Sequence, residues 1–222
     1  MRMARLIELG VIALLSAAVL PREQASAVPQ RVCRVDEAAR EPSLTRFRSR
    51  LLAAAKSHEI ERLRPLVWPR VSLTAGAPVH GFEALRRSEH LDDKTSPFWP
   101  DLETMLGQGG VFDGSDFCAP YISCPAPPPW AGSLVILGER VPAYEQPRAS
   151  SAVVGVLSCD VLHVPDEGMP PSIQATKDFT PVLLPKGGWG YVESRFVGIA
   201  ASYLHIGRRD GRWLLVSFGG FD

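Results

Sequence analysis

A proline segment divides the chain into two halves with different hydrophobic patterns. Residues 124–129 read Cys-Pro-Ala-Pro-Pro-Pro, and each proline fixes its own φ and lacks an amide hydrogen for a helix or a sheet. Such a run is a stiff, extended spacer, and we take 124–130 as a Pro-rich linker. Before it, apolar residues recur at spacings of three and four; after it, they come in short runs broken by turns. The chain is therefore expected to be α+β, with a helical N-terminal region followed by strands.

The region 43–123 is expected to be mostly short helices. Ser43 suits an N-cap because its side chain can accept a hydrogen bond from an amide of the first turn. The pattern breaks at Ser57-His58, which predicts two helices with a kink, and Pro65 and Pro69 should end the second. Further helices are expected at 81–91 and 96–106, and a short strand at 71–74.

After the linker the pattern predicts strands. Five or six short β segments are expected within 131–198, at the spacing of a small barrel. The tail, 199–222, is expected to be a separate β-hairpin because Asp210-Gly211 lies between two strand-like runs.

Residues 133–197 carry short motifs in a recognisable order. A proline at the end of 143–147 is followed by small polar residues and a Val-Val-Gly-Val-Leu strand at 150–157. A second short apolar run lies at 161–164, and the stretch 188–196 contains Gly-Tyr-Val and ends on a phenylalanine. The order resembles the bacterial SH3-like domain, often called SH3b. The sequence departs from the usual pattern at Tyr144–Pro147, which replaces Arg-Ser-Gly-Pro, and at Cys159-Asp160, which replaces a glycine. The aromatic expected before the last hairpin is supplied only by Phe179. The resemblance implies a small β-barrel over 131–198 with a binding role.

A second resemblance concerns the flanks of that stretch. The helices at 44–66 and the closing hairpin at 210–213 resemble the cone-shaped folds of the nuclear-transport-factor-2-like class. In such a fold the barrel would be an insertion before the last hairpin. However, too few strands are expected before the linker to build the sheet of the cone. The sequence leaves open whether the barrel is inserted in a larger α+β domain.

The first 27 residues have the features of a secretory signal peptide. Arg2 and Arg5 precede an uncharged apolar run at 9–20, and Ala25-Ser26-Ala27 is a small-x-small cleavage site. Twelve helical residues span about 18 Å, whereas the bilayer core needs about 30 Å. We therefore expect cleavage after Ala27, a periplasmic or secreted product beginning with an extended arm at 28–42, and no membrane span in the mature form.

Four cysteines remain in the exported part of the chain: Cys33, Cys118, Cys124 and Cys159. An even number in an oxidising compartment predicts two disulfides, although the sequence allows three pairings. We favour the local pair Cys118–Cys124, which leaves Cys33–Cys159. No close Cys-x2-Cys pair of the kind used by zinc sites is present. We expect neither a metal nor a cofactor.

The charge balance and the absence of catalytic motifs argue against two classes of function. The chain has 24 Lys+Arg and 24 Asp+Glu, which argues against nucleic-acid binding because that needs a basic surplus. Neither His-Glu-x-x-His nor Gly-x-Ser-x-Gly occurs, so we expect no enzymatic activity. Two alternatives stay open. One is a cell-wall hydrolase with Cys118 or a carboxylate as catalyst; the other is an interaction or inhibitor protein that binds a partner through the exposed edges of the barrel.

The candidate ligand-binding residues are Tyr144, Trp189 and Tyr191. In SH3-like domains, aromatic residues between the loops commonly line the ligand groove, and planar rings suit sugars and extended peptides. The alternative is that Trp189 and Tyr191, which alternation puts on the same side of one strand, both belong to the core. The resemblance implies a binding protein of the bacterial cell envelope that recognises peptidoglycan or an envelope protein. The ligand and the oligomeric state stay open.

Overall fold

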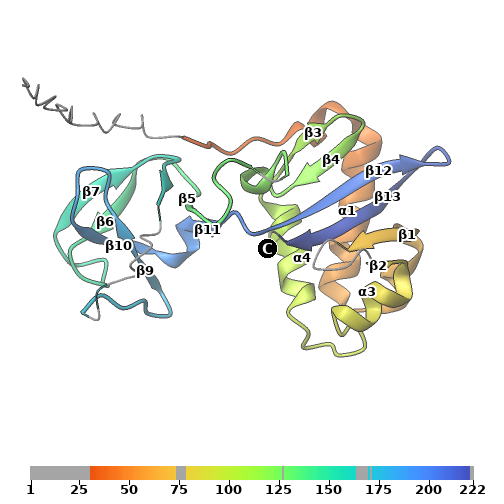
Figure 1. Cartoon of the computed structure of the whole chain (residues 1–222), viewed down its shortest axis with the longest axis horizontal. Helices are drawn as coiled ribbons and strands as arrows, with labels where there is room; N and C mark the ends of the chain where they lie inside the picture. Colours follow the sequence, from red (N-terminus) through yellow and green to blue (C-terminus); the bar gives the residue numbers. More distant parts are fainter. Residues whose placement is uncertain (1–30, 74–78, 127, 164–169, 171, 221–222) are drawn as a thin grey trace, which may run out of the picture.

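The computed structural model describes residues 31–73, 79–126, 128–163, 170 and 172–220. The expected signal peptide and its cleavage site at Ala25 and Ala27 lie outside these residues. The described chain is mixed α+β, with four α-helices and three sheets. Figure 1 shows two lobes side by side. We call 37–123 with 200–220 the larger lobe, and 131–199 the inserted lobe.

The helices of the larger lobe begin close to the positions that the apolar spacing predicts. They are α1 (Pro42–Ser57), α2 (Ile60–Leu63), α3 (Phe82–Ser88) and α4 (Phe98–Gly107). The expected cap at Ser43 is wrong, because Pro42 already occupies the first turn and Glu41 is the N-cap, accepting a hydrogen bond from the Ser43 amide at 3.2 Å. The expected break is present: α1 ends at Ser57, and the next residue, the C-cap His58, has a φ of 50°, which leaves the helical region. None of the described helices is both long enough and apolar enough to cross a membrane.

The larger lobe also contains a six-stranded sheet of order β2-β1-β13-β12-β4-β3. The expectation that 43–123 is mostly helical therefore needs correction, because four of the six strands come from that region. Pro69 lies inside β1 rather than at a helix end, and it is tolerated because the ladder with β13 is irregular between Val67 and Ser72. The strands are β1 (Val67–Leu73), β2 (Val79–His80), β3 (Val111–Asp113), β4 (Asp116–Ala119), β12 (Ser202–Arg209) and β13 (Arg212–Gly220).

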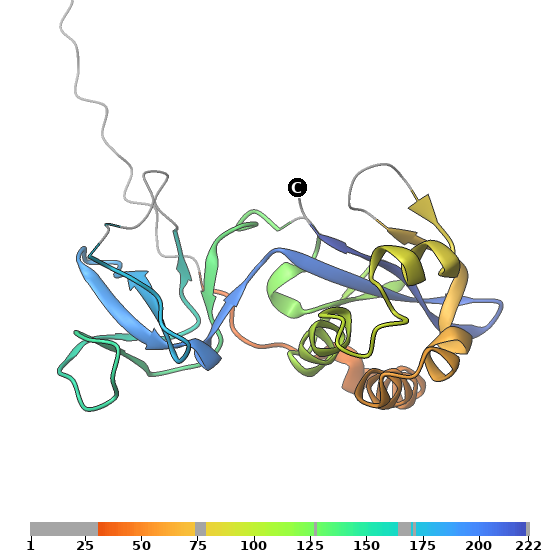
Figure 2. The same ribbon diagram turned by 90° about the horizontal axis from the view of Figure 1, so that it is seen from below.

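The C-terminal hairpin is the centre of this sheet rather than a separate element. Strand β13 pairs in parallel with β1, and β12 pairs antiparallel with β4. Because Leu204, Ile206 and Leu215 of the hairpin are buried, the hairpin needs neighbours on both sides and a helical layer beneath it. Figures 1 and 2 show α1 and α4 side by side on one face of the sheet.

The inserted lobe consists of two small sheets, of order β7-β6-β10-β9 and β11-β5-β8, and neither is closed into a barrel within the described residues. Among the described residues, one hydrophobic cluster uses residues between 134 and 197, and the core of the larger lobe uses residues 38–119 and 204–218. A third, small cluster packs Val135, Leu137 and Val161 of the inserted lobe against residues that include Tyr121, Ile122 and Trp130. The strands of the inserted lobe are β5 (Leu134–Ile136), β6 (Val141–Tyr144), β7 (Val153–Leu157), β8 (Val161–Leu162), β9 (Phe179–Leu183), β10 (Trp189–Glu193) and β11 (Val197–Ile199).

This lobe is an insertion between two neighbouring strands of the larger sheet. It enters after β4 and leaves before β12, which pair with each other. Its two ends meet, because β5 pairs with β11 and the Gly132 amide donates to the Ala200 carbonyl at 2.9 Å. The question that the sequence left open is therefore answered, since residues before and after the insert build one sheet.

Both disulfides form as the sequence favoured. Cys118–Cys124 closes a short loop next to the junction, and Cys33–Cys159 ties the N-terminal arm to the inserted lobe. The described part of the arm is extended only as far as residue 36, and Glu37–Arg40 forms a 3-10 turn. Disulfides persist in oxidising compartments, so their presence fits a protein outside the reducing cytoplasm.

Candidate functional site

The three predicted aromatic residues lie together on one face of the four-stranded sheet. Tyr191 of β10 stands directly opposite Tyr144 of β6, and Trp189 stands opposite Leu183 of β9. Residues directly opposite one another share a face of the sheet, and successive residues of a strand alternate between faces. Val192 follows Tyr191 and belongs to the core of the inserted lobe. The aromatic residues are therefore on the face opposite that core.

Burial limits what this aromatic face can offer to a ligand. Tyr144 and Tyr191 are only 9% and 8% exposed, while Trp189 is half-buried. Phe179 packs edge-on against Tyr144, with ring centroids 6.0 Å apart and planes at 82°. The two tyrosines thus mainly pack within the lobe. A ligand-binding role for these residues stays a prediction, and it rests on Trp189.

The exposed apolar surface of the inserted lobe is concentrated on another element, β7. In the described part of the chain five large apolar side chains are exposed, and three of them belong to this strand: Val153 is 55% exposed, Val154 44% and Val156 63%. Strand β7 is the end strand of its sheet, so among the described residues one of its edges has no strand partner. Such an edge presents backbone donors and acceptors to which another strand can pair.

A hollow of about 320 Å³ lies beside this edge. Val154, Leu157 and Leu184 give it apolar walls, and Lys186 lies at the turn between β9 and β10. Leu184 lies close to the backbone of β7, because a β-carbon built on Gly155 would already be 3.4 Å from its Cδ2 atom. The hollow is therefore suited to an apolar side chain that points from a strand laid along β7.

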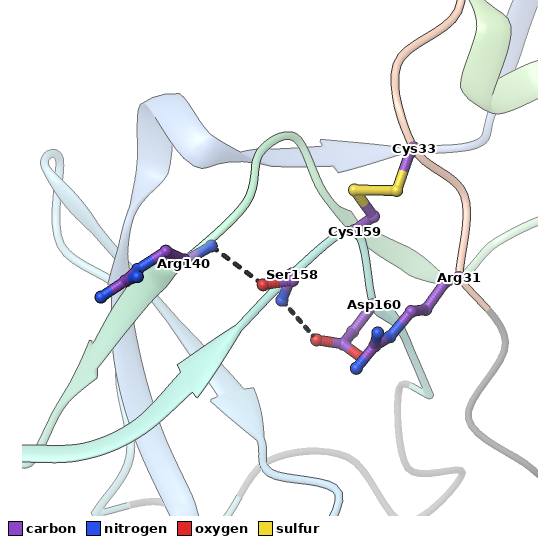
Figure 3. The surroundings of a disulfide bond; sticks show 6 residues. All are labelled: Arg31, Cys33, Arg140, Ser158, Cys159 and Asp160. Carbon is purple, nitrogen blue, oxygen red and sulfur yellow. Dashed lines mark hydrogen bonds and ion pairs between the residues drawn. A yellow bond between two sulfur atoms is a disulfide. The ribbon is translucent and has the colours of Figure 1, made fainter.

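The far wall of the hollow is fixed by the segment around the Cys33–Cys159 disulfide (Figure 3). Asp160 is 5% exposed; its Oδ2 accepts a hydrogen bond from the Ser158 amide at 2.6 Å, and its Oδ1 lies 3.6 Å from Arg31 Nε. Ser158 in turn accepts from the Arg140 amide at 2.9 Å through its Oγ. These bonds hold the wall in place before any ligand arrives, which lowers the entropy cost of binding.

The apolar pattern of residues 153–157 predicts a strand but does not by itself indicate a site. The signal was present: Val153-Val154-Gly155-Val156 is apolar at consecutive positions, whereas a strand with one solvated face alternates. An uninterrupted run is typical of a strand buried on both faces. Only the sheet order shows that this strand ends a sheet.

The structure removes one of the catalytic alternatives. The Cys118 sulfur is bonded to Cys124, and a disulfide sulfur is not the thiolate that a cysteine hydrolase needs. The same reason applies to metal binding: the one described cluster of three possible ligands is Cys33, Cys159 and Glu139, and its two sulfurs are joined to each other. A scan against protein-family models and a search of curated protein sequences both return no match for this chain.

Proposed function

We propose that the protein is an exported, non-enzymatic binding protein of the bacterial cell envelope, whose SH3-like inserted lobe binds an extended segment of an envelope protein along β7. The observation that carries the proposal is the exposure of Val153, Val154 and Val156 on a strand whose outer edge has no described partner. The larger lobe and the disulfides provide the rigid support.

Affinity and selectivity would come from two different features of this surface. Backbone hydrogen bonds to the open edge of β7 would supply affinity without regard to sequence, and the hollow beside it would select an apolar side chain on the incoming strand. Val154 and Val156 both line the hollow, so a ligand strand seated there would cover both at once. Removing valine surface from water is favourable in proportion to the area covered.

Peptidoglycan is the competing ligand. Its sugar rings would need an exposed aromatic side chain to stack on. Tyr144 and Tyr191 are buried, so of the three aromatic residues Trp189, which is half-buried, is the one that could serve. A polypeptide fits the exposed surface better, because that surface is a strand edge bordered by valines.

The test uses mature protein, residues 28–222, and a displayed library of random peptides as the probe. Selected peptides should be extended and rich in apolar residues at alternating positions. Their affinity should fall in Val156→Lys and in Val154→Lys. Val35→Lys is the matched control, because Val35 is also an exposed valine, at 38%, but belongs to the N-terminal arm.

A parallel arm measures co-sedimentation with purified peptidoglycan sacculi. Peptide binding that depends on Val156, without pelleting, would support the proposal. Pelleting that is lost in Trp189→Ala and kept in Val156→Lys would overturn it in favour of a wall-binding module. Failure to select any peptide would also overturn it.

A further inference from the structure

A second cleft, in the larger lobe, carries a concentration of positive charge. It has a volume of about 600 Å³ and lies between α1 and the turn that joins β12 to β13. Figure 1 shows this turn at the end of the larger lobe away from the inserted lobe. The cleft is lined by Arg46 and Arg50 of α1, by Arg208, Arg212 and Trp213 of the hairpin, and by Ser43 among others.

The charge of the cleft is not balanced by its own walls. Four guanidinium groups line it, and none of the described residues that line it is a carboxylate. The whole chain has equal numbers of basic and acidic side chains, so the excess is local. Arg46 and Arg50 are four residues apart on α1 and therefore share one face of the helix. Among the described residues, neither these two nor Arg212 has an ion-pair partner.

Other arginines of the same region are paired. Arg48, between the two cleft arginines on α1, lies 2.6 Å from Asp36, and Arg209, next to Arg208, lies 3.0 Å from Asp116. The side chains that turn away from the cleft thus have carboxylate partners. By contrast, Arg46, Arg50 and Arg212, which line the cleft, have no ion-pair partner among the described residues.

One of the four guanidiniums is held in position before any ligand binds. Arg208 Nη2 donates to Ser43 Oγ at 3.1 Å and lies 3.3 Å from Glu41 Oε2, and its guanidinium lies 4.8 Å from the centre of the Trp213 ring. Trp213 Nε1 donates to the same Ser43 Oγ at 2.8 Å. Because Glu41 balances only one charge, the cleft keeps a net positive charge from the other three guanidiniums.

We propose that this cleft binds a phosphate-bearing ligand. A guanidinium presents paired N–H donors that match the oxygens of phosphate, and helix and hairpin arginines approach from two sides. A phosphate monoester carries about two negative charges at neutral pH, whereas a carboxylate carries one and would leave more of the cleft charge unbalanced. The side chains of Phe47, Leu66 and Trp213 give the remainder of the ligand an apolar wall.

The experiment titrates mature 28–222 calorimetrically with sn-glycerol 3-phosphate and with inorganic pyrophosphate, and compares acetate as a monovalent anion. The variants are Arg46→Gln with Arg50→Gln, and Arg212→Gln. Arg148→Gln is the matched control, because Arg148 is exposed on the inserted lobe and has no described ion-pair partner. We expect the affinity for phosphate to fall at least tenfold in the cleft variants and to be unchanged in the control. The thermal midpoint should not fall in the cleft variants, because they remove unpaired like charges.

A second arm separates the two possible sources of the phosphate. Co-sedimentation with phosphatidylglycerol vesicles, relieved by sn-glycerol 3-phosphate, would assign a lipid headgroup; binding in solution without pelleting would assign a small phosphorylated molecule. No phosphate binding in either arm would overturn the proposal. So would equal binding of acetate, or an equal loss in Arg148→Gln, since both would indicate nonspecific charge.

Discussion

The disulfide between Cys33 and Cys159 should contribute more to stability than any single side-chain contact of the N-terminal arm. It joins residues 126 apart in sequence. On the chain-entropy model, closing a loop of that length in the unfolded chain stabilises the folded state by about 5 kcal/mol, against about 2 kcal/mol for a loop of the length closed by Cys118–Cys124. Removing a native disulfide from a secreted domain typically costs about 2–5 kcal/mol, and this bridge closes a long loop, so we expect Cys33→Ala with Cys159→Ala to cost about 3–5 kcal/mol.

The other contacts of the arm with the inserted lobe cannot replace this bridge. The Val32 amide donates to the Cys159 carbonyl at 2.7 Å, which is worth about 1 kcal/mol. The ion pair of Arg31 with Asp160 adds little because the Arg31 side chain is 67% exposed.

The assay is urea unfolding of mature 28–222, followed by tryptophan fluorescence and by far-ultraviolet circular dichroism. Mass spectrometry should show that Cys118–Cys124 stays intact in the variant. Val35→Ala in the same arm is the control and should change the free energy of unfolding by less than about 0.5 kcal/mol. A loss below about 1 kcal/mol in the double variant would mean that the bridge does not restrict the unfolded chain, and the prediction would be wrong.

Three further predictions test the two cores and the arm. Trp99 is fully buried, and its Nε1 donates to the Asp93 carbonyl at 3.2 Å. Trp99→Ala should therefore lower the free energy of unfolding, measured by urea titration, by about 3–5 kcal/mol. A loss under about 1 kcal/mol would contradict the place of Trp99 in the core. A β-carbon at Gly190 would lie 3.1 Å from that of Ala143, so Gly190→Ala should lower the free energy of unfolding by about 1–3 kcal/mol. An unchanged thermal midpoint would contradict this close packing. Burial by itself would raise the pKa of Asp36, but the hydrogen bond and charge of Arg48 and the amide of Ala38 together hold that pKa below the usual 3.8. Asp36→Asn should therefore destabilise the protein at neutral pH, and its difference from wild type should disappear as the pH falls through the folded-state pKa of Asp36; a difference that persists in acid would argue against the ion pair.

Local patterns predicted the local parts of the fold. The spacing of apolar residues located α1 and α4, and the Asp210-Gly211 turn located the β12–β13 hairpin. The separation of only six residues identified Cys118–Cys124. Each of these features depends on residues that are close in sequence.

The features that the sequence did not reveal depend on residues far apart in the chain. The hairpin is central in its sheet because β1 and β4 pair with it, and those pairings cross more than 80 residues. β3 and β4 have only three and four residues, too few for a clear alternation. The exposure of Val156 follows from the sheet order. The cationic cleft joins Arg46 to Arg212, which are 166 residues apart in sequence and lie together only in the folded lobe.

The central claim, that β7 is the binding edge, is tested most directly by amide hydrogen exchange of mature 28–222 with and without a selected peptide. Backbone pairing with a ligand strand must slow exchange at the amides that form the new hydrogen bonds. We expect new protection within Val153–Leu157 and in the turn at Pro185–Gly187, and no such protection in Val156→Lys. Protection confined to the face of Trp189, or unchanged exchange over β7 at saturating peptide, would contradict it.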